Sequence, residues 1–316
     1  MASILITMTE DRESDRHGKF VSIYDIDHRD GEAYGNALVD LGHNVFYGNW
    51  DDFDGSQFTR VYDVGKGIFS VSLDLASVHL IFVYKMEGFL KDLPRFFNMV
   101  DCFEQSGAIV VNDPKTIRHN IDKQYLFELS GLGISVVPTF ELDQAELLLD
   151  KFEKLVVKPK KGERGGAQEL VTSGAQLNKY DGLESGYIVQ QFLPFVSEGE
   201  VSLVFLGHEY HHAVLKKPNH GHQGEYRCNG CLGGYNEPYK ASTGEIEFGN
   251  QVLRAYESLG FPIHFSRIDY IMGDSGPVLI EAELLNPAVF SNKHNPHFSM
   301  ALGKYFSSLM GNSDRM

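Results

Sequence analysis

Short apolar runs separated by polar segments make up the first third of the chain. Four of them have the length of a strand: residues 3–8, 44–47, 79–84 and 108–112. Two intervening segments carry apolar residues at helical spacing: residues 31–41 and 90–106. Alternating strands and helices predict an α/β unit with a parallel sheet over residues 1–113. The charged segment 9–29 is expected to be an exposed loop, and loops at the carboxyl ends of such strands carry ligands.

Beyond residue 113 the pattern changes to helices and longer extended runs. The apolar spacing predicts three helices: residues 115–132, 246–259 and 301–310. One face of the first helix would carry Ile121, Tyr125, Leu126 and Leu129. Extended runs predict strands: residues 136–139, 155–159, 187–194, 200–206 and 209–216. The last two are expected to form a hairpin about Gly207-His208.

Acidic and apolar residues alternate along two further runs, on either side of a turn at 273–276. This period-two alternation predicts a strand hairpin with two different faces. One face would carry Asp269, Glu281 and Glu283, and the other Ile268, Ile280, Ala282 and Leu284. Three neighbouring carboxylates repel one another unless a cation lies among them, and such oxygen ligands suit Mg²⁺. A solvated acidic face is the alternative interpretation of the same pattern.

Basic residues and glycines precede this acidic hairpin. Lys158 ends an apolar run and enters the segment 160–166, which contains three glycines and three more basic residues. Glycines let backbone N–H groups turn toward an anion, but no Gly-Lys-Ser/Thr opens a helix here, so this is not a P-loop. Lys216, Lys217 and Arg227 add positive charge before the acidic residues. The whole grouping suggests a polyphosphate–metal site, whereas a basic surface loop is the alternative for the glycine segment alone.

Composition narrows the classes of function. The net charge of −15 argues against nucleic acid or an anionic membrane as the main partner, because phosphate binding needs basic surfaces. No apolar run approaches membrane-spanning length, and the N-terminal run is too short for a signal peptide. With three cysteines a disulfide framework is not expected, and a reducing cytoplasm is the simplest location.

Two of the three cysteines, Cys228 and Cys231, form a lone C-x-x-C pair. His220 and His222 lie nearby in the sequence, so a structural zinc site is one interpretation. Two small loop residues without a metal is the other, and the favoured, interpretation.

Several short motifs follow one another over residues 108–310. In chain order they are Asn120-x-Asp122-Lys123, Val156-Val157-Lys158-Pro159, Gln190-Gln191-Phe192-Leu193-Pro194, Glu198-Gly199-Glu200, Lys216-Lys217-Pro218, Gly224-Glu225-Tyr226-Arg227, Arg267-x-Asp269 and Glu281-x-Glu283-x-x-Asn286-Pro287. In this order and spacing they resemble the ATP-grasp superfamily, and specifically its glutathione-synthetase-like branch. Ligases of the D-cycloserine synthetase type are the nearest resemblance.

The resemblance implies an ATP-grasp fold that combines the α/β and α+β classes. A Rossmann-like parallel-sheet domain over residues 1–113 would come first. A central lid subdomain (114–194) and a C-terminal subdomain with the metal site (195–316) would follow. Both are α+β subdomains in this family, and ATP would lie sandwiched between them.

The resemblance also implies a role for each matching residue. The nucleotide-binding residues would be Lys123, Lys158, Gly162, Gly165, Gly166, Gln191, Phe192, Leu193 and Glu200. Of these, the lysines would contact phosphates and the adenine side, 191–193 the adenine edge, Glu200 the ribose, and the glycines would form a lid. Two Mg²⁺ ions, or Mn²⁺ in their place, would be held by Asp269, Glu281 and Glu283. The γ-phosphate or the acyl-phosphate transition state would be stabilised by the catalytic residues Lys216, Arg227 and Arg267.

One departure from the family pattern affects the metal site. Many ATP-grasp enzymes have Asn where this chain has Glu283, and a carboxylate can still ligate Mg²⁺. Asn286 is a further candidate oxygen ligand.

The activity that the resemblance implies is an ATP-dependent carboxylate–amine ligase that forms an amide through an acyl phosphate. The substrates would be a small-molecule carboxylate and an amine, at least one of them amino-acid-like, and relatives permit a homodimer. Three alternatives stay open at this point: an intramolecular cycloligase of the D-cycloserine synthetase type, a kinase that stops at the phosphorylated acid, and a non-catalytic ATP-binding module.

Overall fold

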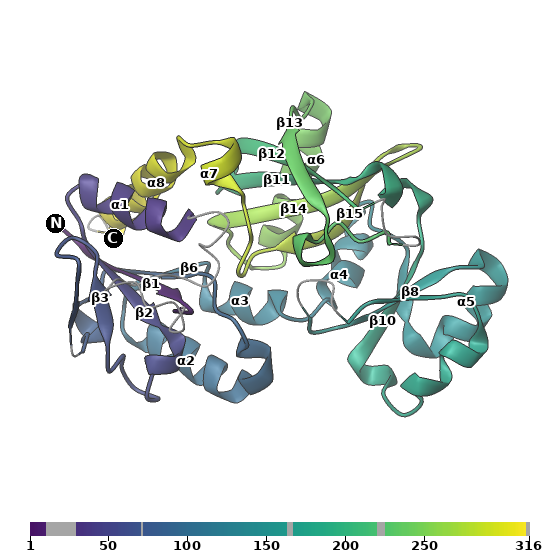
Figure 1. Ribbon diagram of the computed structural model, residues 1–316, viewed down its shortest axis with the longest axis horizontal. Helices are drawn as coiled ribbons and strands as arrows, with labels where there is room; N and C mark the ends of the chain where they lie inside the picture. The colour runs from purple at the N-terminus through teal and green to yellow at the C-terminus, as the bar shows by residue number, and fades with distance from the viewer. Residues whose placement is uncertain (11–29, 71, 163–166, 220–224, 314–316) are drawn as a thin grey trace.

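The computed structural model describes residues 1–10, 30–70, 72–162, 167–219 and 225–313. Its strands form three sheets, which follow one another along the long axis of the molecule in the order first, third, second (Figure 1). Most of the predicted loop at 9–29, the glycines at 165 and 166, and the histidines at 220 and 222 lie outside the described residues.

The first sheet has six strands in the order β4-β3-β2-β1-β5-β6. Their bounds are β1 Ser3–Met8, β2 Asn44–Asn49, β3 Val61–Asp63, β4 Ile68–Ser70, β5 Leu80–Val83 and β6 Ile109–Val111. The pairs β1–β2, β1–β5 and β5–β6 are parallel, which confirms the predicted parallel sheet. The edge strands β3 and β4, which the apolar pattern did not predict, pair antiparallel.

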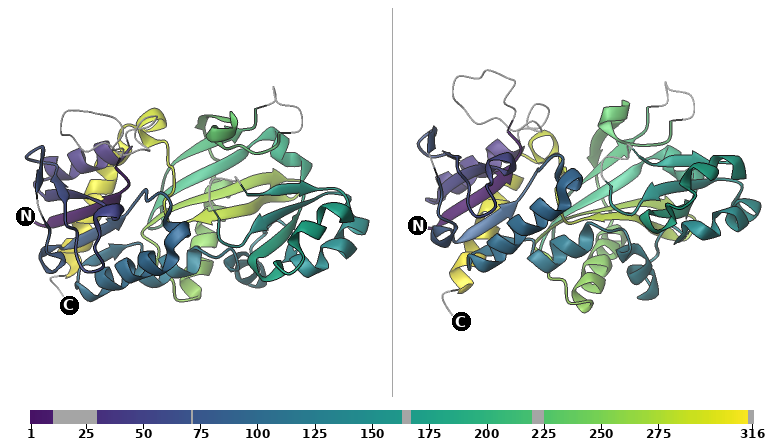
Figure 2. Two further views of the ribbon diagram at one scale, coloured as in Figure 1. Left: turned by 60° about the horizontal axis from the view of Figure 1, so that its bottom comes forward. Right: turned by 90° about the horizontal axis from the view of Figure 1, so that it is seen from below.

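Helices cover both faces of the first sheet, because alternate residues of β1 point to opposite sides. Ile4 and Ile6 pack in a core with residues of α1 (Asp30–Asp40) and α8 (Phe298–Ser313). Leu5 packs in a second core with residues of α2 (Leu93–Gln105) and α3 (Pro114–Asn120). The last helix of the chain therefore returns to the first sheet, and both termini lie at this end of the molecule (Figures 1 and 2).

The second sheet is antiparallel, with strand order β7-β10-β8-β9. Its strands are β7 Thr139–Glu141, β8 Leu155–Pro159, β9 Glu169–Val171 and β10 Tyr187–Gln191, and helix α5 (Ala145–Phe152) lies beside β8. Leu155, Val157 and Val189 point into a small core that Leu148, Leu149 and Phe152 of α5 partly cover. The opposite face of β8, which includes Val156 and Lys158, is left to line a cavity.

The third sheet is also antiparallel, with strand order β13-β12-β11-β14-β15. Its strands are β11 Glu200–Leu206, β12 Glu209–Lys217, β13 Tyr235–Tyr239, β14 Phe265–Gly273 and β15 Gly276–Glu283, so both predicted hairpins are confirmed. Helices α4 (Tyr125–Gly131) and α6 (Thr243–Ser258) supply apolar residues to the core on one face of this sheet. The short helix α7 (Ser291–His294) follows β15.

The single helix predicted over 115–132 is wrong, because the chain breaks between α3 and α4. Its apolar face serves two cores: Ile121 packs with the first sheet, and Tyr125 with the third. The break is stabilised locally, since Asp122 Oδ1 accepts a hydrogen bond of 3.0 Å from the Gln124 N–H. The Lys123 N–H then donates to the Lys160 carbonyl at 2.9 Å, which places Lys123 beside the second sheet.

The predicted position of Ile280 on the apolar face of the acidic hairpin is also wrong. In the register of the two strands Glu281 opposes Asp269 and Leu279 opposes Tyr270, so Ile280 is an extra residue. Such a bulge changes the side on which the following residues lie. Leu279 is consequently buried in the core, and Ile280 lines the cavity with the acidic residues.

Candidate active site

A cavity of about 610 Å³ is lined by residues of the second and third sheets and by loops at the edge of the first sheet. Every predicted site residue within the described part of the chain lines it: Lys123, Lys158, Gly162, Gln191, Phe192, Leu193, Glu200, Lys216, Arg227, Arg267, Asp269, Glu281 and Glu283. The volume lies within the roughly 300–1,000 Å³ typical of small-molecule sites.

The charge of the cavity is opposite to that of the whole chain. Its described lining contains six Lys and Arg residues but only four Asp and Glu residues, although the chain carries a net charge of −15. Positive charge gathered inside a concave, partly desolvated site attracts anions. The lining therefore suits an anionic ligand better than any neutral one.

Asp269 is the centre of an ion-pair network on the third sheet. Its Oδ1 accepts hydrogen bonds from Ser202 Oγ at 2.7 Å and from Arg267 Nε at 2.8 Å. Its Oδ2 accepts from Lys216 Nζ at 2.9 Å and from Arg267 Nη2 at 2.7 Å. Burial alone would raise the pKa of Asp269, but Arg267 and Lys216 outweigh it and hold this pKa well below its usual value. Asp269 is thus ionised and fully bonded.

The two cations of this network each bind a second carboxylate. Arg267 donates to Glu283 and, through Nη1, to the Ala288 carbonyl at 2.8 Å, while Lys216 donates to Glu200. Burial raises the pKa of Glu200, and it raises the pKa of Glu283 to about 7, where the nearby Asp269 adds to the effect.

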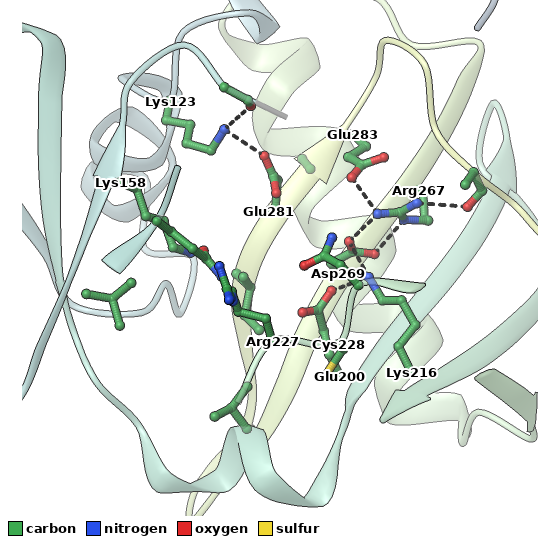
Figure 3. A pocket seen from close by; sticks show the side chains of 18 of the residues that line it. Lys123, Lys158, Glu200, Lys216, Arg227, Cys228, Arg267, Asp269, Glu281 and Glu283 are labelled. Carbon is green, nitrogen blue, oxygen red and sulfur yellow. Dashed lines mark hydrogen bonds and ion pairs between the residues drawn. The ribbon is translucent and has the colours of Figure 1, made fainter. Parts of the chain in front are cut away.

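Glu281 faces the other side of the cavity, where Lys123 lies (Figure 3). The Lys123 ammonium is 3.0 Å from Glu281 Oε1 and donates to the Gly162 carbonyl at 2.8 Å. Burial opposes ionisation of Glu281, but Lys123 and Lys158 hold its pKa below the usual value. Lys123 therefore connects the acidic hairpin to the start of the glycine segment.

Lys158 differs from the other cavity cations because its ammonium makes no hydrogen bond or ion pair with any described residue. It lies at the end of β8, on the same side of the pocket as Lys123 in Figure 3. Burial lowers its pKa, and the nearby Glu281 carboxylate offsets the lost hydration only in part. An anionic ligand in the cavity would supply the missing partner.

The end of β10 offers a backbone donor to the cavity. Its neighbours are already bonded, since the Gln191 N–H donates to the Pro138 carbonyl at 3.0 Å and the Phe192 N–H to the Lys154 carbonyl at 3.1 Å. The Leu193 N–H has no partner among the described residues. Apolar side chains of Val137, Val156 and Ile271 line the same part of the cavity, which suits a flat base with polar edges.

Comparison with known proteins is consistent with this geometry. No family model matches the chain. It is 25% identical over 215 residues to a probable alpha-L-glutamate ligase of Maridesulfovibrio salexigens, covering 62% of this chain and 69% of that protein. It is also 25% identical over 190 residues to the glutathione synthetase of Prochlorococcus marinus, covering 56% of this chain and 58% of that enzyme. The chain thus spans between about half and two-thirds of these relatives.

Solved structures match over nearly the whole chain. A crystal structure of a D-cycloserine synthetase superposes with a TM-score of 0.75 at 16% identity, covering 98% of this chain and 99% of that one. A macrocyclase from Microcystis aeruginosa, bound with its precursor peptide, gives a TM-score of 0.64 at 15% identity, with 98% and 99% covered. The chain has the ATP-grasp fold of these ligases. The predicted fold is confirmed.

ATP-grasp ligases use ATP and Mg²⁺, and the donor atoms of this cavity fit the metal in part. Among the described residues no three His, Cys, Asp or Glu side chains converge closely enough to hold a metal ion. Glu281 and Glu283 each keep one carboxylate oxygen without a described partner, whereas both oxygens of Asp269 are bonded. Asn286 is not a spare ligand, because its amide pairs with the backbone of Met86.

Tyr226 is a cavity residue that the sequence prediction missed. Its ring packs edge-on against Phe192, with centroids 5.4 Å apart, and its buried hydroxyl has no hydrogen-bond partner. Burial raises the pKa of this hydroxyl to about 12, so it remains a donor. The neighbouring Arg227 is held by Glu225, with Nε–Oε1 and Nη2–Oε2 distances of 2.8 Å. Tyr226 lies within the motif Gly224-Glu225-Tyr226-Arg227, so its place beside Arg227 could have predicted a cavity position.

The zinc interpretation gains no support in the described part of the chain. Cys228 is buried against the cavity, and burial raises the pKa of its thiol to about 12, which disfavours the thiolate that zinc requires. The Cys231 side chain lies outside the described residues.

None of the described helices combines the length and apolar character needed to cross a membrane.

Proposed function

We propose that this ATP-grasp ligase joins a small carboxylic acid to an amine, using ATP and Mg²⁺ and passing through an acyl phosphate. The observation that carries the proposal is Lys158, a half-buried cation that lines the cavity with no hydrogen-bond or ion-pair partner among the described residues. A partly desolvated charge without a partner points to a ligand that brings negative charge.

The nucleotide would lie between the second and third sheets. Leu193 N–H and the neighbouring groups of Gln191 and Phe192 would read the adenine edge. Lys123 and Lys158 would bind phosphates, Glu200 the ribose hydroxyls, and Gly162, with Gly165 and Gly166, would cover the phosphates. This arrangement corresponds to the division of the chain at residues 1–113, 114–194 and 195–316, with α8 returning to the first sheet.

Glu281, Glu283 and Asp269 would hold the metal, which would neutralise charge on the phosphate oxygens. Asp269 can contribute only if Arg267 or Lys216 releases it, so binding of metal and nucleotide would exchange partners within the network. The released Arg267 and Lys216, together with Arg227, would then stabilise the charge that develops during phosphoryl transfer.

No covalent nucleophile is required for this reaction, because positioning and charge neutralisation suffice for phosphoryl transfer. The acid's carboxylate oxygen would attack the γ-phosphorus and release ADP. The amine would then displace phosphate from the acyl carbon and lose a proton. Acyl phosphates hydrolyse readily, so the cavity must exclude water, and a glycine-rich cover suits that task.

The matched proteins support amide formation by their names, which include a glutamate ligase and glutathione synthetases. Because the fold is also similar to that of a D-cycloserine synthetase, an intramolecular cycloligase is the alternative activity. Mass spectrometry of the product separates the cases: condensation of two substrates, loss of water from one, or a retained phosphate, the last marking a kinase. ATP binding without turnover across a broad panel of acids and amines would favour the non-catalytic module.

Glu281→Gln tests the proposal most cleanly. The amide keeps the size of the side chain and an acceptor for Lys123, but removes the charge that the metal needs. In a screen of amino acids and small carboxylic acids, phosphate release with an active substrate should fall at least about 100-fold. Glu247→Gln, an exposed carboxylate on α6, is the matched control and should keep full turnover. Full turnover in folded Glu281→Gln, checked by circular dichroism, would reject the proposed site.

The ion count and assembly state extend the proposal. Two Mg²⁺ ions per nucleotide, replacement by Mn²⁺ and a homodimer stay predictions, which metal titration of phosphate release and sedimentation can test. Because the chain has only three cysteines, too few for a disulfide framework, we also propose a reducing, cytoplasmic location.

A further inference from the structure

The edge strand of the third sheet brings a polar side chain to the cavity that the nucleotide proposal leaves unused. Asn236, on β13, is half-buried and lines the cavity. Asparagine is uncommon inside strands, because its amide competes with the backbone for hydrogen bonds. The hydrogen bonds of this amide therefore indicate what Asn236 can do in the site.

Two basic residues of α7 fix the orientation of the Asn236 amide. Its Oδ1 accepts a hydrogen bond of 3.0 Å from Lys293 Nζ and lies 2.7 Å from His294 Nε2. An ammonium can only donate, so the amide atom that faces Lys293 must be the oxygen. Lys293 and His294 do not belong to the described cavity lining, so Oδ1 points away from the cavity and Nδ2 is left on the cavity side.

The Nδ2 group of Asn236 is available to a ligand. It carries two N–H donors and has no hydrogen-bond partner among the described residues. It is also absent from the described polar atoms that are both buried and unpaired, so it remains accessible. The amide thus presents donors, and not an acceptor, to a molecule in the cavity.

Strand pairing places Asn236 next to the residues proposed to act on the nucleotide. Asn236 pairs with Lys216 of β12, and Lys216 pairs with Glu200 of β11. Directly paired residues project from the same side of a sheet with Cβ atoms about 5 Å apart, and all three residues line the cavity. The row Glu200, Lys216, Asn236 runs toward the sheet edge. With the ribose at Glu200 and the γ-phosphate at Lys216, as proposed above, Asn236 faces the molecule that receives the phosphate.

The segment after β15 connects this amide to the arginine of the acidic network. Arg267 Nη1 donates to the Ala288 carbonyl at 2.8 Å, and Ala288 lines the cavity. The chain then enters α7, from which Lys293 binds Asn236. One short segment therefore positions both the arginine that would meet the transferred phosphate and the amide at the sheet edge.

We propose that the Asn236 Nδ2 group donates a hydrogen bond to a second carboxyl group of the acid substrate, and so selects a dicarboxylic acid. The proposal rests on the proposed ligase function, because it names the class of acid whose first carboxylate would be phosphorylated. A carboxylate brings acceptors only, whereas a hydroxyl or an amine also brings a proton that meets the N–H donors.

The charge of Lys293 favours the same ligand. Through Oδ1 this ammonium polarises the amide, which makes the N–H groups of Asn236 better donors to an anion. Asn236 is thus a specificity-determining residue for the acid, and Lys293 is a positioning residue that acts through it.

The alternative role of Asn236 is structural: Oδ1 would only attach α7 to the sheet edge. The two roles use different atoms of the amide. Asn236→Asp separates them, because aspartate keeps the oxygen that Lys293 and His294 bind and removes only the N–H donors. This variant should keep the fold and the affinity for nucleotide, and lose the preference for a second carboxyl group.

Calorimetry on the full chain measures that preference. The probes are four dicarboxylic acids, each matched with an acid that has a methyl group in place of one carboxyl: succinate with butyrate, glutarate with pentanoate, L-aspartate with L-2-aminobutyrate, and L-glutamate with L-norvaline. Each is titrated into protein saturated with Mg²⁺ and the non-hydrolysable analogue AMPPNP. In wild type at least one dicarboxylic acid should bind at least about tenfold tighter than its match.

The variants should change this preference and nothing else. Asn236→Asp should abolish it, because the donors are lost and a like charge takes their place, while AMPPNP and the matched monocarboxylates bind as before. Lys293→Met should reduce the preference, and Lys293→Arg should retain it. Asn178→Asp at an exposed site outside the cavity lining and Lys304→Met on α8 are the matched controls and should behave as wild type.

Three results would overturn the inference: wild type binds both members of every pair equally, Asn236→Asp keeps the wild-type preference, or Asn236→Asp weakens AMPPNP and all acids alike, as the structural role requires. An unchanged preference in Lys293→Met would overturn the positioning role of that lysine.

Failure of the ligase proposal is visible separately. A preference that depends on Asn236, in a protein that releases no phosphate from ATP with any acid, would reject the ligase and leave the inference. Phosphate release that needs Glu281 but is unchanged by Asn236→Asp with every dicarboxylic acid would do the reverse.

Discussion

The second and third sheets line the same cavity but prepare their polar groups in opposite ways. All four carboxylates of the described lining come from the third sheet, where Arg267 and Lys216 satisfy three of them. The second sheet contributes no carboxylate to the lining, and it leaves Lys158 and the Leu193 N–H without described partners. Most charges of the third-sheet wall are paired within that wall, whereas two groups of the second-sheet wall are left for a ligand.

This difference separates stability from binding. Buried ion pairs that are fully bonded add little net stability, but removal of one partner is strongly destabilising. A half-buried cation without a partner loses part of its hydration in the empty protein, and an anionic ligand offsets that loss. Substitutions in the third sheet should therefore act mainly on folding, and substitutions in the second sheet mainly on affinity for the nucleotide.

The largest effect is expected for Asp269→Ala. This change leaves Arg267 and Lys216 buried with too little negative charge, and should lower the free energy of unfolding by about 3–5 kcal/mol in urea denaturation. Asp101→Ala removes the partner of Arg118 at an exposed site and should cost less than about 1 kcal/mol. If Asp269→Ala lowers the free energy of unfolding no more than Asp101→Ala does, the ion pairs of the third sheet do not stabilise the fold as proposed.

The sequence was informative where one side of an element faces one core. Period-two alternation predicted the hairpins of the third sheet, and the charges on them marked Asp269, Glu281 and Glu283 as neighbours. The same reasoning failed where a segment serves two cores, as between Ile121 and Tyr125, because a continuous apolar face cannot show that its parts belong to different cores.

Other features were beyond prediction because they depend on long-range contacts. The bulge at Ile280 follows from pairing with β14, and alternation within one strand does not encode the register of its partner. Lys85 and Asn286 both have a positive φ and are joined by hydrogen bonds between segments 200 residues apart, which no local pattern shows. The sequence also gave no sign that Lys158 would lack a partner while Lys123 has two.

A smaller and opposite effect is expected for Lys158→Met on the second sheet. Loss of the unpaired ammonium should weaken binding of Mg²⁺·AMPPNP at least tenfold, or about 1.4 kcal/mol, in calorimetry. The free energy of unfolding without ligand should stay the same or rise, because a half-buried charge without a partner is replaced by an apolar group of similar length. Lys151→Met on α5, an exposed lysine beside the same sheet, should change neither quantity. A lower free energy of unfolding together with unchanged nucleotide affinity in Lys158→Met would contradict the proposed difference between the two sheets.

The smallest effect concerns the pH dependence of stability, and it separates two carboxylates of the same hairpin. Burial raises the pKa of Glu283 from about 4.5 to about 7, so between these pH values the folded protein holds a proton that the unfolded chain releases. The free energy of unfolding must therefore fall as pH rises through this window. Glu283→Gln removes the titration and should flatten the fall, measured by urea denaturation at pH 5, 6, 7 and 8 with EDTA and without nucleotide.

Glu281→Gln is the internal comparison, since Lys123 and Lys158 lower the pKa of Glu281 against the effect of burial. The stabilisation that ionised Glu281 gives to the fold is complete above the ordinary pKa of a carboxyl group. It is lost only as the pH falls through the lowered pKa of Glu281. Within pH 5–8 the slope of Glu281→Gln should therefore match that of wild type. Parallel slopes for Glu283→Gln and wild type would mean that Arg267 keeps Glu283 ionised in the folded protein. Three ionised carboxylates would then stand on the third sheet, and it would bind Mg²⁺ equally well at pH 6 and pH 8.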